Sequence, residues 1–171
     1  MVVGTYLCDM KDVTLTINKA DVYDEVAKTT SYVGAKLQGE EGAYNRIFTK
    51  DADQLMLERF WVAACDGATA PLKHYISEVS NHELKREVDM SNNYTVKLNL
   101  PDAFDDTLVK SIQSSLFNYF ALFVTSKWFR LVNRSETDSY LEEAVSFLDD
   151  AVTKIYHRTR PVRPTYTEST L

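Results

Sequence analysis

The chain has 171 residues, a formal net charge of -6 and an apolar fraction of 44%. This length suits one domain with a proper core and is short for two. The ordinary apolar fraction argues against a largely disordered chain. The acidic balance argues against a nucleic-acid-binding protein, because an acidic surface repels DNA. Two cysteines, Cys8 and Cys65, are too few for a disulfide framework, and we expect free thiols in a reducing cytoplasm. The N-terminal residues lack the basic and long apolar segments of a signal peptide.

The first predicted elements are a strand and a helix. Residues 13–17 (VTLTI) alternate apolar residues with threonine, which is typical of a half-buried strand. Asn18 supplies an N-cap side chain, and residues 19–37 carry apolar side chains at helical spacing. Threonine, serine and glycine at residues 29–34 lower the helix propensity, so an interruption is possible there. Residues 39–48 lack periodicity and are predicted to form a loop.

A second helix is predicted from Thr49, read as its N-cap, to Val79. Apolar residues recur every three or four positions along it, with a kink expected at Gly67 and Pro71. Residues 80–93 are polar and predict a turn with irregular structure. Residues 94–100 (YTVKLNL) alternate again and predict a strand, which we expect to pair with residues 13–17 because an isolated strand leaves its backbone unpaired.

The densest apolar run is SLFNYFALFVTSKWFRLV, residues 115–132, in a helix expected to begin at residues 105–107. Its large side chains fall on nearly every face, which predicts a buried helix, and its charged residues argue against a membrane span. A cap cluster at residues 135–138 precedes an apolar stripe that continues to Tyr156. The two helices should form an antiparallel hairpin. One partner helix and one strand pair are too little to cover the run, so we predict that Phe117 and Phe120 become fully packed only against a neighbouring subunit.

The sequence therefore predicts a mainly α protein: residues 1–157 form a single domain of about four helices with two short strands, at about 13–17 and 94–100. Residues 158–171 form an extended basic arm, because prolines prevent helix formation. The arm residues expected to contact a partner or another subunit are Arg158, Arg160, Pro161, Arg163, Pro164 and Tyr166. The arm could bind phosphate or an acidic protein surface, and the acidic body favours the second.

No catalytic constellation is recognisable, so we predict a protein that is not an enzyme and needs no cofactor or metal. The histidines His74, His82 and His157 are scattered without metal-ligand spacing. Neighbouring acidic pairs point in different directions on a helix and are better read as solvated faces. Glycine-rich phosphate loops and nucleophile elbows are missing from the sequence. Trp61 and Trp128 lie on apolar stripes without interleaved basic residues, which favours core packing over base stacking.

The order of several sequence segments resembles that of a known protein family. A strand leading into DVYDEVAKTTSYVGAK is followed by DADQLMLERFWVAACDGATAPL, YTVKLNLP, SIQSSLFNYFALFVTSKWF, LDDAVTKIYHR and a final RPVRP. This order is similar to small virion proteins of phages and prophages of Bacteroides-type bacteria, and to head-to-tail adaptor, or ring, proteins of tailed phages, including crAss-like phages.

The resemblance implies a structural virion protein made in the host cytoplasm. It implies a homo-oligomeric ring, a dodecamer, that docks to the portal protein, extends the DNA channel and contacts other tail proteins, without a membrane and without sequence-specific DNA binding. An acidic channel lining would let DNA slide. The two β segments depart from the plainest adaptor pattern, which leaves the position of the ring open. The alternative is a cytoplasmic, non-enzymatic helical module that binds or regulates another protein.

Overall fold

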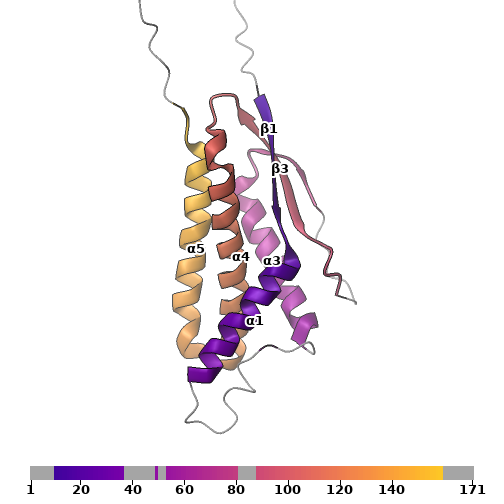
Figure 1. The fold of residues 1–171 in the computed structure, drawn as a ribbon, viewed down its shortest axis with the longest axis vertical. Helices are drawn as coiled ribbons and strands as arrows, with labels where there is room; N and C mark the ends of the chain where they lie inside the picture. The colour runs from indigo at the N-terminus through magenta and orange to yellow at the C-terminus, as the bar shows by residue number, and fades with distance from the viewer. Residues whose placement is uncertain (1–9, 37–48, 50–52, 81–87, 160–171) are drawn as a thin grey trace, which may run out of the picture.

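The computed structural model describes residues 10–36, 49, 53–80 and 88–159. Within these ranges the elements are β1 (Met10–Ile17), α1 (Lys19–Lys36), α3 (Gln54–Leu72), β2 (Ile76–Val79), β3 (Tyr94–Pro101), α4 (Val109–Val132) and α5 (Arg134–Tyr156). A 3-10 turn at Asp106–Leu108 precedes α4. The chain is mainly helical with a small antiparallel sheet (Figure 1), which confirms the predicted fold class.

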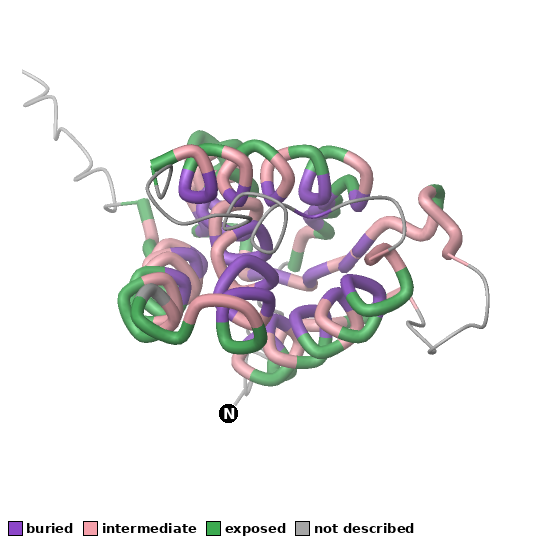
Figure 2. The backbone as a smooth tube through the Cα atoms, turned by 90° about the horizontal axis from the view of Figure 1, so that it is seen from below, coloured by how far each residue is buried: buried purple, intermediate pink, exposed green. Residues whose placement is uncertain are grey.

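Helix α4 is the centre of the core, as its apolar run predicts. It packs against α5 along its length and also contacts α3, α1 and β1. The Phe120 ring lies 4.9 Å from Trp61 of α3 and 5.1 Å from Tyr94 of β3, measured between ring centroids. Figure 2 shows the buried positions gathered on the sides of the elements that face one another. Trp61 and Trp128 are both buried, so their interpretation as core residues is confirmed.

The predicted pairing of the two strands is confirmed. Strands β1 and β3 are antiparallel, with Val13 opposite Leu98 and Leu15 opposite Val96. All four of these side chains are buried against the helices. The other face of the sheet is polar and carries an ion pair between Lys97 and Asp12 at 3.0 Å. The sheet thus separates a core face from a solvent face, as period-two alternation requires.

The predicted helix from residue 49 to 79 is wrong at both ends. Helix α3 begins at Gln54 with Asp53 at its N-cap position, so Thr49 is not the N-cap; its backbone N–H instead donates to the Thr30 hydroxyl at 3.3 Å. The helix ends at Leu72, one residue after Pro71, and residues 76–79 form a third strand that the sequence did not predict. The order β1-β3-β2 puts β3 in the middle. Pairing with the second edge of β3 therefore outweighed the helical spacing of the apolar residues.

Other boundaries also differ from expectation. Helix α1 continues through residues 29–34, where the Thr30 hydroxyl donates to the Ala27 carbonyl at 3.1 Å. Helix α5 starts at Arg134, before the predicted cap cluster, and the predicted hairpin with α4 is confirmed. Asn18 caps α1 as predicted, since its side-chain oxygen accepts from the Ala20 N–H at 2.9 Å. The predicted loop at 39–48 and Cys8 lie outside the described residues.

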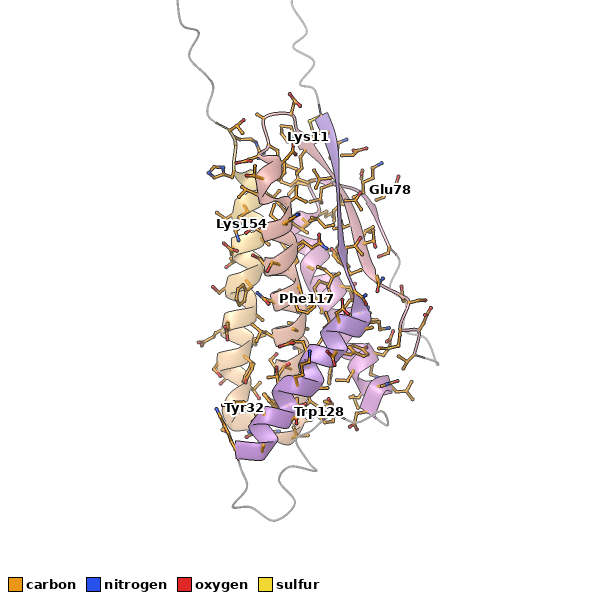
Figure 3. The ribbon with its side chains drawn as sticks, viewed as in Figure 1. Lys11, Tyr32, Glu78, Phe117, Trp128 and Lys154 are labelled. Atoms are coloured by element: carbon orange, nitrogen blue, oxygen red, sulfur yellow. The ribbon has the colours of Figure 1, made fainter. Side chains whose placement is uncertain are left out.

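The prediction that Phe120 is incompletely packed in a single subunit is wrong. Its side chain is 0% exposed, because rings from α3, α4 and β3 enclose it. Phe117 is half-buried and lines a hollow between α4 and the junction of β1 with α1 (Figure 3), and its packing against another subunit stays a prediction. The exposed apolar side chains lie elsewhere, including Tyr32 on α1 and Val145 on α5.

Helices α3 and α4 approach closely at Gly67, which gives a test of the packing. A Cβ at Gly67 would lie 2.3 Å from the Tyr119 hydroxyl oxygen but 3.6 Å from its ring carbon Cζ. We expect Gly67→Ala to destabilise the protein by about 1–2 kcal/mol, because overpacking outweighs the better helix propensity of alanine. In a Tyr119→Phe background the same change should instead stabilise by about 0.5–1 kcal/mol. Urea unfolding of the four proteins measures both values, and the same sign in both backgrounds would contradict this packing.

Candidate functional site

The root of the predicted arm is attached to the body of the protein. Arg158 forms an antiparallel bridge with Phe104, and the Thr159 N–H donates to the Ala103 carbonyl at 2.9 Å. The Arg158 guanidinium donates to the Ile155 carbonyl at 2.7 Å, which closes the end of α5. Arg158 and Thr159 therefore contact the body at the start of the predicted arm, and the arm itself stays a prediction. Arg160, Pro161, Arg163, Pro164 and Tyr166 lie outside the described residues.

Strand β1 begins beside this arm root. The Lys11 ammonium donates to the Phe104 carbonyl at 2.8 Å and forms an ion pair with Asp106 at 2.9 Å. It also lies 5.5 Å from the centroid of the buried Phe104 ring, a cation–π contact. Figure 1 shows the start of β1 and the end of α5 at the same end of the molecule. We call this end, made of Met10, Lys11, Ala103, Phe104, Asp106, Arg158 and Thr159, the arm-root end.

One edge of β1 is open within the described part of the chain. In β3, the Asn99 N–H donates to Tyr75 and the Thr95 carbonyl accepts from Ser80, so odd-numbered residues of β3 direct their backbone groups away from β1. Their opposite residues in β1, Asp12 among them, must then direct theirs away from β3. Across the described ranges no further strand pairs with β1. The Gln113 side chain covers one group, donating to the Thr16 carbonyl at 2.8 Å.

The inner end of β1 is held by a buried ion pair that the sequence analysis missed. The Lys19 ammonium pairs with the Glu58 carboxylate of α3, and the two residues are 0% and 1% exposed. The ammonium also donates to the Asp89 carbonyl at 3.0 Å, and the backbone N–H of Lys19 donates to the Asn93 side chain at 3.0 Å. This cluster therefore joins the β1–α1 junction, α3 and the turn before β3.

Aromatic groups complete the cluster. The Tyr23 hydroxyl donates to Glu58 at 3.1 Å, and the Lys19 ammonium lies 5.8 Å from the Tyr23 ring centroid and 5.9 Å from that of Trp61. Burial, and then the Glu58 charge, raise the pKa of Tyr23. Burial also raises the pKa of the nearby Cys65 thiol, so it stays protonated at neutral pH. The charged groups here are enclosed and hydrogen-bonded, which suits a structural role better than catalysis.

The sequence did contain a signal for this cluster. Glu58 lies three and seven residues before Trp61 and Cys65, so it shares an apolar helix face with them. A carboxylate on such a face indicates either a local break in the core or a buried cation partner. Lys19 gave no comparable signal, because it directly follows an N-cap residue and reads as a solvated first-turn side chain.

The described residues show no arrangement for metal chemistry, since no group of three or more His, Cys, Asp and Glu side chains is placed to hold an ion. His74 and His157 are exposed, and His82 lies outside the described residues. None of the helices in these ranges combines the length and apolar content needed to span a bilayer. Comparison with protein-family models, curated proteins and solved structures returns no match.

The buried cluster can be tested by removing its charges singly and together. We expect Lys19→Met to destabilise the protein by about 3–5 kcal/mol, because the Glu58 carboxylate is left buried without a cation. Glu58→Gln should also destabilise, whereas the double variant should lose clearly less than the sum, because it leaves no charge buried without a partner. Chemical denaturation of the cycle measures the coupling. Additive effects below about 1 kcal/mol each would show that the pair does not hold the fold together.

Proposed function

We propose that the protein is a non-enzymatic structural subunit that assembles into a ring of identical copies, as a head-to-tail adaptor of a tailed phage. The observation that carries the assembly role is the open edge of β1 next to the arm root. An unpaired strand edge is a template for a strand from another chain, and proteins that remain monomeric usually cover or distort it.

The geometry of the arm root supports the same proposal. The chain leaves Thr159 at a fixed point, beside Ala103 and near the start of β1. Residues 160–171 follow, with Arg160 and Arg163 in a chain whose net charge is -6. At roughly 3.3 Å per residue an extended arm of this length reaches far enough to lie along a neighbouring copy. The basic arm and the acidic body favour contact between copies.

The proposed role in a virion rests on the resemblance of the sequence segments to those of adaptor proteins. In such a ring, copies would surround a DNA channel, with the portal on one side and tail proteins on the other. An acidic surface is suited to a channel through which DNA must slide without sticking. The elongated bundle, with the arm root at one end and the α4–α5 turn at the other, offers two separate ends for these contacts (Figure 1).

The role of the open edge is tested by Thr14→Pro. Thr14 is exposed and lies opposite Lys97, so its N–H points away from β3 and proline removes no bond of the β1–β3 ladder. We expect the variant to fold but to lose ring formation in size-exclusion chromatography with light scattering and in negative-stain electron microscopy. Thr14→Val, which keeps the N–H, is the matched control. Rings of normal size from the proline variant would rule out assembly through this edge.

The role of the arm is tested separately by ending the chain after Thr159. Because the described body keeps all of its core contacts, we expect the shortened protein to unfold at nearly the same denaturant concentration as the full chain. It should remain monomeric under conditions in which the full chain forms rings. A full-length protein that stays monomeric, alone and with portal protein, would contradict the adaptor function itself.

A further inference from the structure

A basic hollow lies at the turn between α4 and α5. It has a volume of about 390 Å³ and is lined by Ser126, Lys127, Arg130, Arg134, Thr137, Asp138 and Leu141. Two of its cations come from the last turns of α4 and the third is the first residue of α5. We call it the basic notch. It lies at the end of the molecule marked by Trp128 in Figure 3, opposite Lys11 and the arm root.

The cations of the basic notch have no carboxylate partner among the described residues. Arg130 and Arg134 are exposed and form no ion pair there, and the Lys127 ammonium lies only over the Phe123 ring, 4.9 Å from its centroid. Several lysines elsewhere in the described chain do form ion pairs, as Lys28 does with Asp24 at 2.6 Å. In an acidic protein, where carboxylates outnumber cations, three neighbouring unpaired cations are unexpected.

The position of Arg134 is unfavourable for α5 itself. A cation at the first residue of a helix faces the positive end of the helix dipole, where an acidic residue would stabilise the helix. The preceding Asn133 does not offset this, because its side-chain oxygen accepts from the Ser135 hydroxyl at 2.7 Å and makes no cap hydrogen bond. The Thr137 hydroxyl oxygen is enclosed and has no hydrogen-bond partner in the described structure. Folding alone does not account for this arrangement.

We infer that the basic notch binds a phosphate group. Among the lining residues that the structure describes, three cations and the one carboxylate of Asp138 leave an excess of two positive charges, which matches a phosphate dianion better than one carboxylate. The two guanidinium groups can each donate two parallel hydrogen bonds to phosphate oxygens, and the ammonium adds a point charge. The notch is also lined by Arg134 and Thr137 of the first turn of α5, and the start of a helix favours an anion.

The phosphate can belong to a nucleic-acid backbone or to a small phosphorylated compound. The site is independent of ring formation, because all of its residues come from one copy. It is also remote from the arm root: α4 has 24 residues, so its two ends are about 36 Å apart. The proposal thus goes beyond the structural role of the subunit, and it can fail or hold whether or not rings form.

The experiment uses the full-length protein, with pyrophosphate and a short DNA duplex as probes and a glutamate-rich peptide for comparison. Calorimetric titration at low salt compares wild type with the notch variant Arg130→Ser/Arg134→Ser. The matched control is Lys28→Ser/Lys73→Ser, which removes two exposed cations elsewhere. Thermal unfolding of each protein checks that the fold is retained. A further variant, Arg134→Lys, keeps the charge but loses the paired donors of the guanidinium.

We expect the notch variant to lose about tenfold or more in affinity for at least one phosphate probe, while the control stays close to wild type. Loss for DNA with a steep salt dependence identifies a nucleic-acid backbone, whereas loss for pyrophosphate alone identifies a small phosphorylated compound. The affinity of the Arg134→Lys variant for the phosphate probe should fall between those of wild type and the notch variant. The inference is wrong if wild type binds neither phosphate probe, if notch and control variants behave alike, or if the glutamate peptide binds as tightly as the phosphate probes.

Discussion

The buried ion pair between Lys19 and Glu58 is the constraint on which the arrangement of the structure depends. Removing two charges from water costs several kcal/mol for each ion, and only good geometry with further hydrogen bonds offsets that cost. The β1–α1 junction, α3 and the turn at residues 89–93 must therefore all be in place at once. Apolar side chains in contact could shift past one another at little cost, but the Lys19–Glu58 ion pair would lose its hydrogen bonds if either element shifted. It fixes where β1 ends and hence the direction of its open edge.

Lys11 provides the corresponding attachment at the other end of β1. Its ammonium holds the strand to the Phe104 carbonyl and to Asp106, close to the point where Thr159 leaves the body. One lysine at the start of the strand and another just beyond its end thus keep the edge in a defined position. Between α4 and α5, Ser115 donates to Asp150 at 2.6 Å and accepts from Lys154 at 3.0 Å. This polar contact fixes how the hairpin helices align, and so how far apart the two ends of the molecule lie.

The parts of the fold that could be predicted are those in which local pattern and tertiary packing agree. The run of α4 is apolar on nearly every face, while the stripe of α5 and the alternation in β1 and β3 each have one dominant period, and a helix or strand of the expected type forms in each case. Strand β2 could not be predicted, because Tyr75 and Val79 continue the helical spacing of α3 past Pro71. Only the free edge of β3, a tertiary feature, favours a strand there. Phe120 was misjudged for a similar reason, since its cover comes from Trp61 and Tyr94, which are distant in sequence.

The open edge by itself provides only a weak contact. Gln113 already occupies the Thr16 carbonyl, so a docking strand can use the outward groups of Met10, Asp12 and Thr14 and little more. At about 1 kcal/mol net for each hydrogen bond, such a strand falls short of the cost of associating two subunits. An arm attached at Thr159 raises the effective concentration of the strand edge for the neighbouring copy. In a closed ring, every copy supplies an arm to one neighbour and receives the arm of the other. The edge and the arm are therefore expected to act together, because neither is sufficient without the other.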